Sequence, residues 1–75
     1  MALQAYVFMN ALMGDEKKVF NKVKSLESVK EAYMLYGQYD MVAKVYVKSS
    51  DDFKKEISNI RKIKGMRDTL TVQLI

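Results

Sequence analysis

Apolar residues along this chain gather in four short stretches, and two longer stretches with helical spacing lie between them. The short ones, rich in β-branched and aromatic residues, are Gln4–Leu12, Val29–Tyr36, Met41–Val47 and Met66–Ile75. Such residues fit a pleated surface, so we predict four β-strands. The first stretch is apolar at both alternating sets of positions, which indicates a strand covered on both faces.

Each of the two longer stretches predicts an amphipathic helix, because its apolar side chains fall on one side at helical spacing. Asp15 and Glu16 place negative charge where the helix dipole favours it, and Ser49 with Asp52 forms a capping-box pattern. Gly65 ends the second helix in the left-handed conformation. The apolar stripes consist of Val19, Phe20, Val23 and Leu26 in the first helix and of Phe53, Ile57, Ile60 and Ile63 in the second.

The predicted elements follow the order β-α-β-β-α-β, and the two halves match each other at an offset of 37 residues. Two matched βαβ halves predict an α+β fold, the ferredoxin-like sandwich, as a single domain over residues 1–75. Right-handed crossovers then give an antiparallel sheet in the order 4-1-3-2, with both helices on one face. The matched positions are Phe20, Val23, Leu26 and Val29 in one half and Ile57, Ile60, Ile63 and Met66 in the other.

The sheet face away from the helices stays apolar whichever alternating set of residues points there. On the first strand that set is either Tyr6 with Phe8 or Val7 with Met9. An apolar patch of about several hundred Å² is unusual on a monomer. We therefore predict that the open faces of two copies stack as a two-fold dimer. The alternative is that a few tyrosines face water without a partner.

The amino-acid composition of the chain limits which catalytic, metal-binding and disulfide chemistry it can perform. The chain has no cysteine and no histidine, which removes disulfides, the usual zinc sites, thiol nucleophiles and the commonest general base. We predict no enzyme, no catalytic residue, no metal and no cofactor. The net charge is +4, but lysines alternate with acids, which indicates a solvated surface rather than a phosphate-binding face. No apolar run is long enough to span a bilayer, so we expect a cytoplasmic protein without membrane contact.

Three loops share one end of the predicted sheet: Leu12–Gly14, the hairpin Tyr36–Asp40 and the Gly65 turn. The hairpin lies at one edge and the start of the last strand at the other, roughly 14 Å apart over three strand spacings. A small ligand that used both would therefore lie between neighbouring subunits.

The hairpin and the last strand also carry a resemblance to a known family. Tyr36-Gly37-Gln38-Tyr39-Asp40, followed by MVAKVYV, resembles the Gly-x-Tyr-Asp signature of the effector (RAM) domain of Lrp/AsnC transcriptional regulators. The segment 60–71 is similar to the family's stretch around the glycine before its last strand, and AYVFMNA to its first strand. The likeness covers almost the whole chain, but the helix-turn-helix of full regulators is absent, so the chain resembles a stand-alone effector domain.

The resemblance implies a regulatory role in amino-acid metabolism or transcription. It implies a face-to-face dimer that assembles into an octamer of four dimers and binds a free amino acid at the contacts between dimers. It also implies no direct DNA binding by this chain and mixed assemblies with full-length Lrp/AsnC-type regulators.

An amino-acid ligand needs an acceptor for its ammonium group and N–H or hydroxyl donors for its carboxylate. Asp40 is the candidate acceptor, Gly37 lets a ligand approach the backbone, and Thr69 and Thr71 share one strand face. Each has an ordinary alternative: a turn glycine, a carboxylate that bonds the hairpin backbone, and plain strand or packing residues. The full candidate set is Tyr36, Gly37, Tyr39, Asp40, Thr69 and Thr71.

Two other functions remain open at this point. A purely structural assembly module would share every feature except a bound ligand. An RRM-like RNA-binding domain has the same element order and stacks bases on sheet aromatics such as Tyr6, Phe8 and Tyr46. Its RNP1 pattern is absent from MVAKVYV, which disfavours that alternative.

Overall fold

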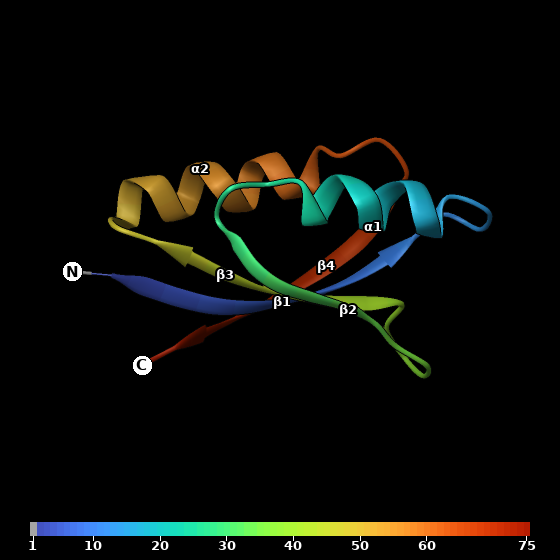
Figure 1. The fold of residues 1–75 in the computed structure, drawn as a ribbon, viewed down its shortest axis with the longest axis horizontal. Helices are drawn as coiled ribbons and strands as arrows, with labels where there is room; N and C mark the ends of the chain where they lie inside the picture. Colours follow the sequence, from blue (N-terminus) through green and yellow to red (C-terminus); the bar gives the residue numbers. More distant parts are fainter. Residues whose placement is uncertain (1) are drawn as a thin grey trace.

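The computed structural model describes residues 2–75 and forms two layers, a sheet with two helices lying across one of its faces (Figure 1). The element order is β-α-β-β-α-β, which confirms the predicted order. The elements are β1 Leu3–Ala11, α1 Glu16–Lys24, β2 Val29–Met34, β3 Met41–Val47, α2 Ser50–Arg61 and β4 Met66–Leu74.

The four strands lie in the order β2-β3-β1-β4, and each neighbouring pair is antiparallel. Read from the other edge, this is the predicted order 4-1-3-2. The register of three strands can be read from one row of paired residues: Val7 of β1 lies opposite Ala43 of β3 on one side and Thr71 of β4 on the other. The two central strands, β1 and β3, are also the most apolar of the four strands in sequence. A central strand has a neighbouring strand along each of its edges.

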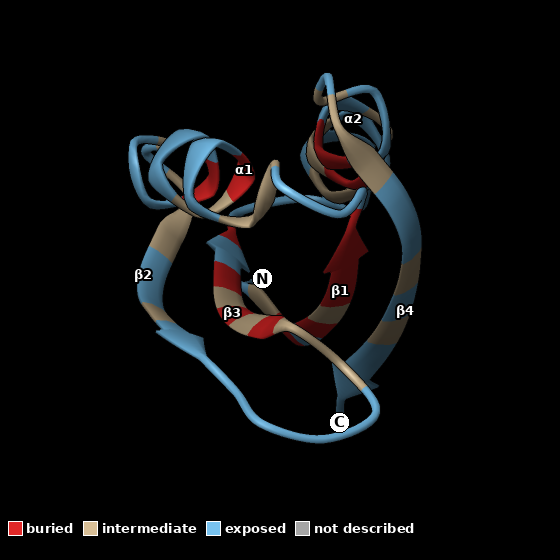
Figure 2. Ribbon diagram, turned by 90° about the vertical axis from the view of Figure 1, so that its right-hand side faces the viewer, coloured by how far each residue is buried: buried red, intermediate tan, exposed pale blue. Residues whose placement is uncertain are grey.

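The hydrophobic core lies between the helices and the central strands, where Figure 2 shows the buried residues concentrated. On β1 the odd-numbered residues from Ala5 to Ala11 are buried, and on β3 the alternate residues from Met41 to Val47 are buried. Val19 and Val23 of α1, together with Ile57 and Ile60 of α2, cover them from the helix side. Alternation along the strands therefore sets which face the helices pack on.

The helix ends follow the predicted signals. The Ser49 hydroxyl accepts a hydrogen bond from the backbone N–H of Asp52 at 3.1 Å, which confirms the N-cap of α2. α1 begins at Glu16, whose carboxylate accepts from the Gly14 N–H at 2.9 Å, while Asp15 occupies the cap position without a side-chain cap bond. Gly65 has a φ of +95°, the left-handed conformation predicted for it.

The internal repeat is confirmed by the turns that follow the two helices. In each turn the residue after the helix donates to two carbonyls of the last helical turn, and two further amide bonds lead into the next strand. The same four bonds occur in both halves, shifted by 37 residues. The donors are Ser25, Leu26 and Val29 in the first half and Lys62, Ile63 and Met66 in the second.

The boundaries of three strands differ from those predicted. β1 lies one residue earlier than Gln4–Leu12, and β4 ends at Leu74 rather than Ile75. β2 ends at Met34 rather than Tyr36, because the last hairpin bond runs from the Leu35 N–H to the Asp40 carbonyl at 2.8 Å and the chain turns beyond it. Within residues 2–75 no helix is both long and apolar enough to cross a membrane.

The sheet face away from the helices carries Tyr6 and Phe8 of β1, so the even-numbered set is the open one. Leu70 and Val72 of β4 lie opposite these two residues and are 46% and 44% exposed. Tyr46 of β3 and Tyr33 of β2 are also exposed on the sheet. The resulting open face, defined by these six residues, is an unpaired apolar surface on a single copy of the chain.

Candidate functional site

The β2–β3 hairpin, residues 35–40, projects below the sheet on the side away from the helices in both ribbon views (Figures 1 and 2). Gly37 has a φ of +130°, which side-chain-bearing residues rarely adopt, so a glycine is required at this turn. No atom lies within 4 Å of the place where a Cβ would stand, so the Gly37 backbone is open to a ligand. The Tyr36 side chain is fully exposed beside it.

The hairpin returns to the sheet through Tyr39 and Asp40. The Tyr39 ring packs against Phe8 of β1 with 5.6 Å between ring centroids, which places Tyr39 on the open face. The Asp40 carboxylate accepts a hydrogen bond from the Ala11 N–H at 2.9 Å. The β1–β4 register shifts between Asn10 and Ala11, and such irregularities leave a backbone group without its ladder partner. Asp40 satisfies that group, so its carboxylate has a structural role on β1 rather than the predicted alternative of a bond to the hairpin's own backbone.

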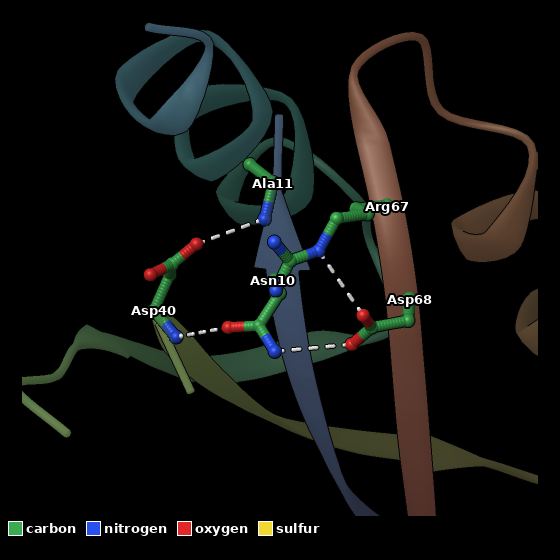
Figure 3. Close-up of polar contacts among 5 residues, drawn as sticks. All are labelled: Asn10, Ala11, Asp40, Arg67 and Asp68. Atoms are coloured by element: carbon green, nitrogen blue, oxygen red, sulfur yellow. Dashed lines mark hydrogen bonds and ion pairs between the residues drawn. The ribbon is translucent and has the colours of Figure 1, made fainter. Parts of the chain in front are cut away.

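Asn10 connects the hairpin to β4, as Figure 3 shows. Its amide oxygen accepts from the Asp40 N–H at 2.9 Å, and its amide nitrogen donates to an Asp68 carboxylate oxygen at 3.0 Å. The other Asp68 oxygen accepts from Nε of Arg67 at 3.2 Å. Asn10 is 7% exposed, the one buried polar residue among residues 2–75. Because both ends of its amide are bonded, the base of the hairpin is held at a fixed position relative to β4.

Thr69 and Thr71 lie on the other face of the sheet. They pair in register with Met9 and Val7 of β1, whose side chains are buried under the helices. The two threonines therefore share a face, as predicted, but it is the helix-covered face. Tyr39 and the Asn10 amide lie on the opposite side, so one copy of the chain does not bring the threonines to the hairpin.

Sequence reasoning missed Asn10 as a structural partner of the site. The available signal was a carboxamide inside an otherwise apolar strand, next to the end of the sheet where the hairpin was predicted. The separation predicted between the hairpin and the last strand also changes. Asp40 immediately precedes β3, which is adjacent to β1 and so only two strands from β4. A single asparagine side chain spans that gap.

The end of the sheet at the hairpin carries two carboxylates, Asp40 and Asp68, beside the Arg67 guanidinium. An ionised carboxylate can accept several hydrogen bonds, so Asp40 and Asp68 retain acceptor capacity beyond the bonds described. Asp68 is 53% exposed at its side chain, and its charge faces solvent beside Arg67. This arrangement suits a small cation such as an ammonium group. Within residues 2–75, no group of three or more acidic, cysteine or histidine side chains is placed to hold a metal ion.

Comparison with known proteins supports the resemblance carried by the hairpin. The sequence matches the family model described as the Lrp/AsnC ligand binding domain over residues 4–74. The chain belongs to this family. The crystal structure of FFRP-DM1 superposes with a TM-score of 0.94 and 34% identity, covering 97% of this chain and 99% of that one. The fold and the family therefore agree along nearly the full length.

Some of the solved structures that share this fold are about twice as long as this Lrp/AsnC ligand-binding domain. E. coli AsnC matches with a TM-score of 0.90 and 25% identity over 97% of this chain but 50% of its own. A transcriptional regulator from Neisseria meningitidis, solved as a complex with L-Met, shares the fold with a TM-score of 0.85 and 17% identity. The homocitrate synthase of Saccharolobus solfataricus is 38% identical over 53 residues, which are 71% of this chain and only 12% of that enzyme.

Proposed function

We propose that this chain is a regulatory domain that senses a free amino acid and works as an assembly of identical copies. The observation that carries the proposal is the match to the ligand-binding family over residues 4–74. The complex of the Neisseria meningitidis regulator with L-Met supports an amino acid as the effector class. Asp40 of the hairpin and Asp68 of β4 supply the acceptors for its ammonium group.

Self-association is supported by the open face. Tyr6, Leu70 and Val72 lie side by side across β1 and β4 and are between 37% and 46% exposed. Stacking two such faces about a two-fold axis removes apolar surface from water on both copies at about 25 cal/mol per Å². Four such dimers in a ring would bring the hairpin of one dimer against another, so an effector bound there would report on assembly. Mixed assemblies with full-length regulators and the lack of direct DNA contact belong to the same proposal.

A second candidate is control of a biosynthetic enzyme rather than of transcription. The similarity to a segment of homocitrate synthases favours it, because a domain of this kind can be part of a metabolic enzyme as well as of a DNA-binding protein. In both cases the domain's own task is to bind the effector and change an assembly. The two candidates differ in what the assembly controls.

Native mass spectrometry with each of the twenty amino acids, added singly, tests the proposal because it reports subunit number and ligand occupancy together. We expect an even-numbered assembly that gains mass with one amino acid or a small group of related ones. A variant with Asp68→Asn should bind that amino acid more weakly while keeping the same subunit number. A monomer at micromolar concentration with no bound amino acid would refute the proposal.

A further inference from the structure

Asn10 is buried on the sheet face that is otherwise open. It belongs to the even-numbered set of β1 residues, together with Tyr6 and Phe8. Tyr6 is 37% exposed, whereas Asn10 is 7% exposed. Carboxamides are seldom buried unless both of their polar ends are bonded, because the lost bonds to water otherwise go uncompensated. The burial of Asn10 therefore depends on its two hydrogen bonds, to Asp40 and to Asp68.

These two bonds allow only one orientation of the Asn10 amide. The ionised Asp68 carboxylate only accepts, so the amide nitrogen must face it, and the Asp40 N–H only donates, so the amide oxygen must face that group. Exchanging the amide oxygen and nitrogen would place acceptor against acceptor and donor against donor. An aspartate at this position would lack the donor, and a leucine, which has a similar branched shape, would lack both groups. The polarity of the two neighbours therefore requires a carboxamide between them.

The irregularity of β1 at this point holds the other part of Asp40. The β1–β4 register shifts between Asn10 and Ala11, and irregularities of this kind redirect side chains and are frequent beside functional sites. The Ala11 N–H donates to the Asp40 carboxylate at 2.9 Å, while the Asn10 amide accepts from the Asp40 N–H at 2.9 Å. Two consecutive residues of β1 therefore fix both the backbone and the side chain of Asp40.

Asp68 is held through both of its carboxylate oxygens. One oxygen accepts from the Asn10 amide at 3.0 Å, and the other accepts from Nε of Arg67 at 3.2 Å. Hydrogen bonds to an ionised group are stronger than bonds between neutral groups, so the Asp68 side chain is constrained although it is 53% exposed. All of these partners belong to one copy of the chain, as Figure 3 shows. The arrangement of the Asp40 and Asp68 carboxylates is therefore set before copies assemble.

We propose that Asn10 is the positioning residue of the effector site: by bridging the hairpin to β4 within one copy, it holds the Asp40 and Asp68 carboxylates in one arrangement before an ammonium group binds. This rests on the proposed function, in which those carboxylates accept from the ammonium group of an amino acid. Asn10 itself does not contact the ligand, because its side chain is buried and both ends of its amide are bonded. Groups that are already ordered bind more tightly, since less conformational freedom is lost on binding.

A double-mutant cycle tests whether the bridge itself supports binding, with each of the twenty amino acids as the probe. Asn10→Asp sets a second carboxylate against Asp68, and Asp68→Asn removes the charged acceptor of the Asn10 amide. Together the two substitutions restore the bridge with its chemistry exchanged, because the side chain on β1 then accepts from both the Asp40 N–H and the amide on β4. We expect each single variant to bind about tenfold more weakly, as for a lost bond to a charged group, and the double variant to bind more tightly than either. A double variant no tighter than Asp68→Asn would overturn the proposal.

Amide hydrogen exchange gives a second readout that needs no ligand. Asn10→Leu keeps the branched shape and removes both bonds, so the amides of Leu35 and Ala11, which bond to the hairpin, should exchange about tenfold faster. The amide of Ile60, in the core of α2, should keep its native rate. Asn59→Leu, which removes an exposed carboxamide on α2, is the control and should leave the hairpin amides unchanged. Native exchange rates at Leu35 and Ala11 in Asn10→Leu would overturn the proposal.

The outcomes separate this proposal from the broader one. If an amino acid binds the native chain and Asn10→Leu with equal affinity, the sensing function stands and the positioning role of Asn10 falls. If no amino acid binds the native chain, the sensing function falls and the positioning role falls with it. If exchange becomes faster throughout Asn10→Leu, that variant has lost its fold, and the double-mutant cycle decides between a positioning role and a merely structural one.

Discussion

The two βαβ halves share their backbone pattern but differ in how each turn packs against the other half. At the first turn, Ser28 donates a hydrogen bond to the Glu56 carboxylate of α2. The equivalent position in the second turn is Gly65, and the residue equivalent to Glu56 is Val19 of α1. A Cβ on Gly65 would stand 3.1 Å from Val19 Cγ2 and 3.0 Å from an Asp15 carboxylate oxygen. The first junction therefore contains a hydrogen bond between two side chains, whereas the second leaves no room for a side chain.

The two halves therefore repeat the backbone hydrogen bonds of the turn, but the side chains that pack at the two turns differ. The four turn bonds of each half involve backbone atoms alone, so any residue that adopts the required φ can make them. Ser28, which lies within the first turn, has no positive φ, whereas Gly65 at the matched position of the second turn has one. The following predictions compare the two halves, at positions matched by the 37-residue offset except at the helix starts. In each the second half is expected to be at least as sensitive, except in the last.

The largest effect is expected at the matched core positions Ile60 and Val23, both of which are fully buried. Ile60→Ala should lower the free energy of unfolding by about 2–5 kcal/mol, because it loses burial and leaves a cavity. Val23→Ala removes one methylene fewer and should cost about 1 kcal/mol less. Urea denaturation followed by circular dichroism measures both. Equal losses would show that the two helices are packed with different tightness.

The two turn residues come next. Gly65→Ala should destabilise the fold by about 1–3 kcal/mol, since a side chain is strained at this positive φ. The close approach of Asp15 and Val19 adds to that cost. Ser28→Ala removes one hydrogen bond at a half-exposed position and should cost about 0.5–1.5 kcal/mol. Thermal unfolding of the two single variants gives the comparison, and a Ser28→Ala loss above that of Gly65→Ala would contradict it.

The N-terminus of α2 is also expected to be more sensitive to substitution than the N-terminus of α1. Ser49 caps α2 through the Asp52 N–H, whereas Asp15 caps α1 with no side-chain bond. Ser49→Ala should therefore lower stability by about 1 kcal/mol. Asp15→Ala should cost only the dipole interaction, about 0.3–1 kcal/mol at low salt, and less as salt is added. Denaturation at two salt concentrations distinguishes a capping bond from a charge effect.

The smallest effect concerns pH. The Tyr33 hydroxyl donates to the Glu31 carboxylate at 2.8 Å, and that hydrogen bond, with the repulsion by the Glu31 charge, raises the pKa of Tyr33 above the ordinary tyrosine value of 10.0. The equivalent residue in the second half is Leu70, which does not titrate. Because the folded-state pKa is raised, the contact favours folding below the ordinary tyrosine pKa and is lost as pH rises through the raised value.

A spectroscopic titration tests this. Site-resolved NMR of the Tyr33 ring should show deprotonation at a higher pH than in an unfolded peptide, and Glu31→Gln should move the pKa of Tyr33 downward. Asp52→Asn, which removes a distant carboxylate, is the control. An unchanged Tyr33 pKa in Glu31→Gln would show that the carboxylate contact is absent in solution.

Much of the fold could be predicted because its signals are local. The β-rich apolar stretches, the stripes on the helices, the Ser49 cap and the left-handed Gly65 each depend on signals within a few residues, and the elements they predicted are confirmed. The β2 boundary was wrong by two residues because the hairpin closes through the Leu35–Asp40 bond rather than at the turn glycine. The family was correctly recognised from the hairpin and the last strand.

The candidate site was predicted less completely. The six residues remain predictions as ligand contacts, and the structure places them in two groups separated by the sheet. The two-residue spacing of Thr69 and Thr71 was enough to predict that they share one face of the last strand. Only the pairing register with β1 shows that this is the face covered by the helices. The Asn10 bridge needs the hairpin and β4 to flank the same end of β1, which no local pattern encodes.

The sequence by itself determined the element order, the repeat, the sheet order and the family, because these depend on periodicity and on short motifs. Only the tertiary structure decided which face of β1 stays open and how Asp40 and Asp68 are joined through Asn10. The Asn10 bridge spans 30 positions to Asp40 and 58 positions to Asp68, and such contacts form only once strand register and helix packing are fixed.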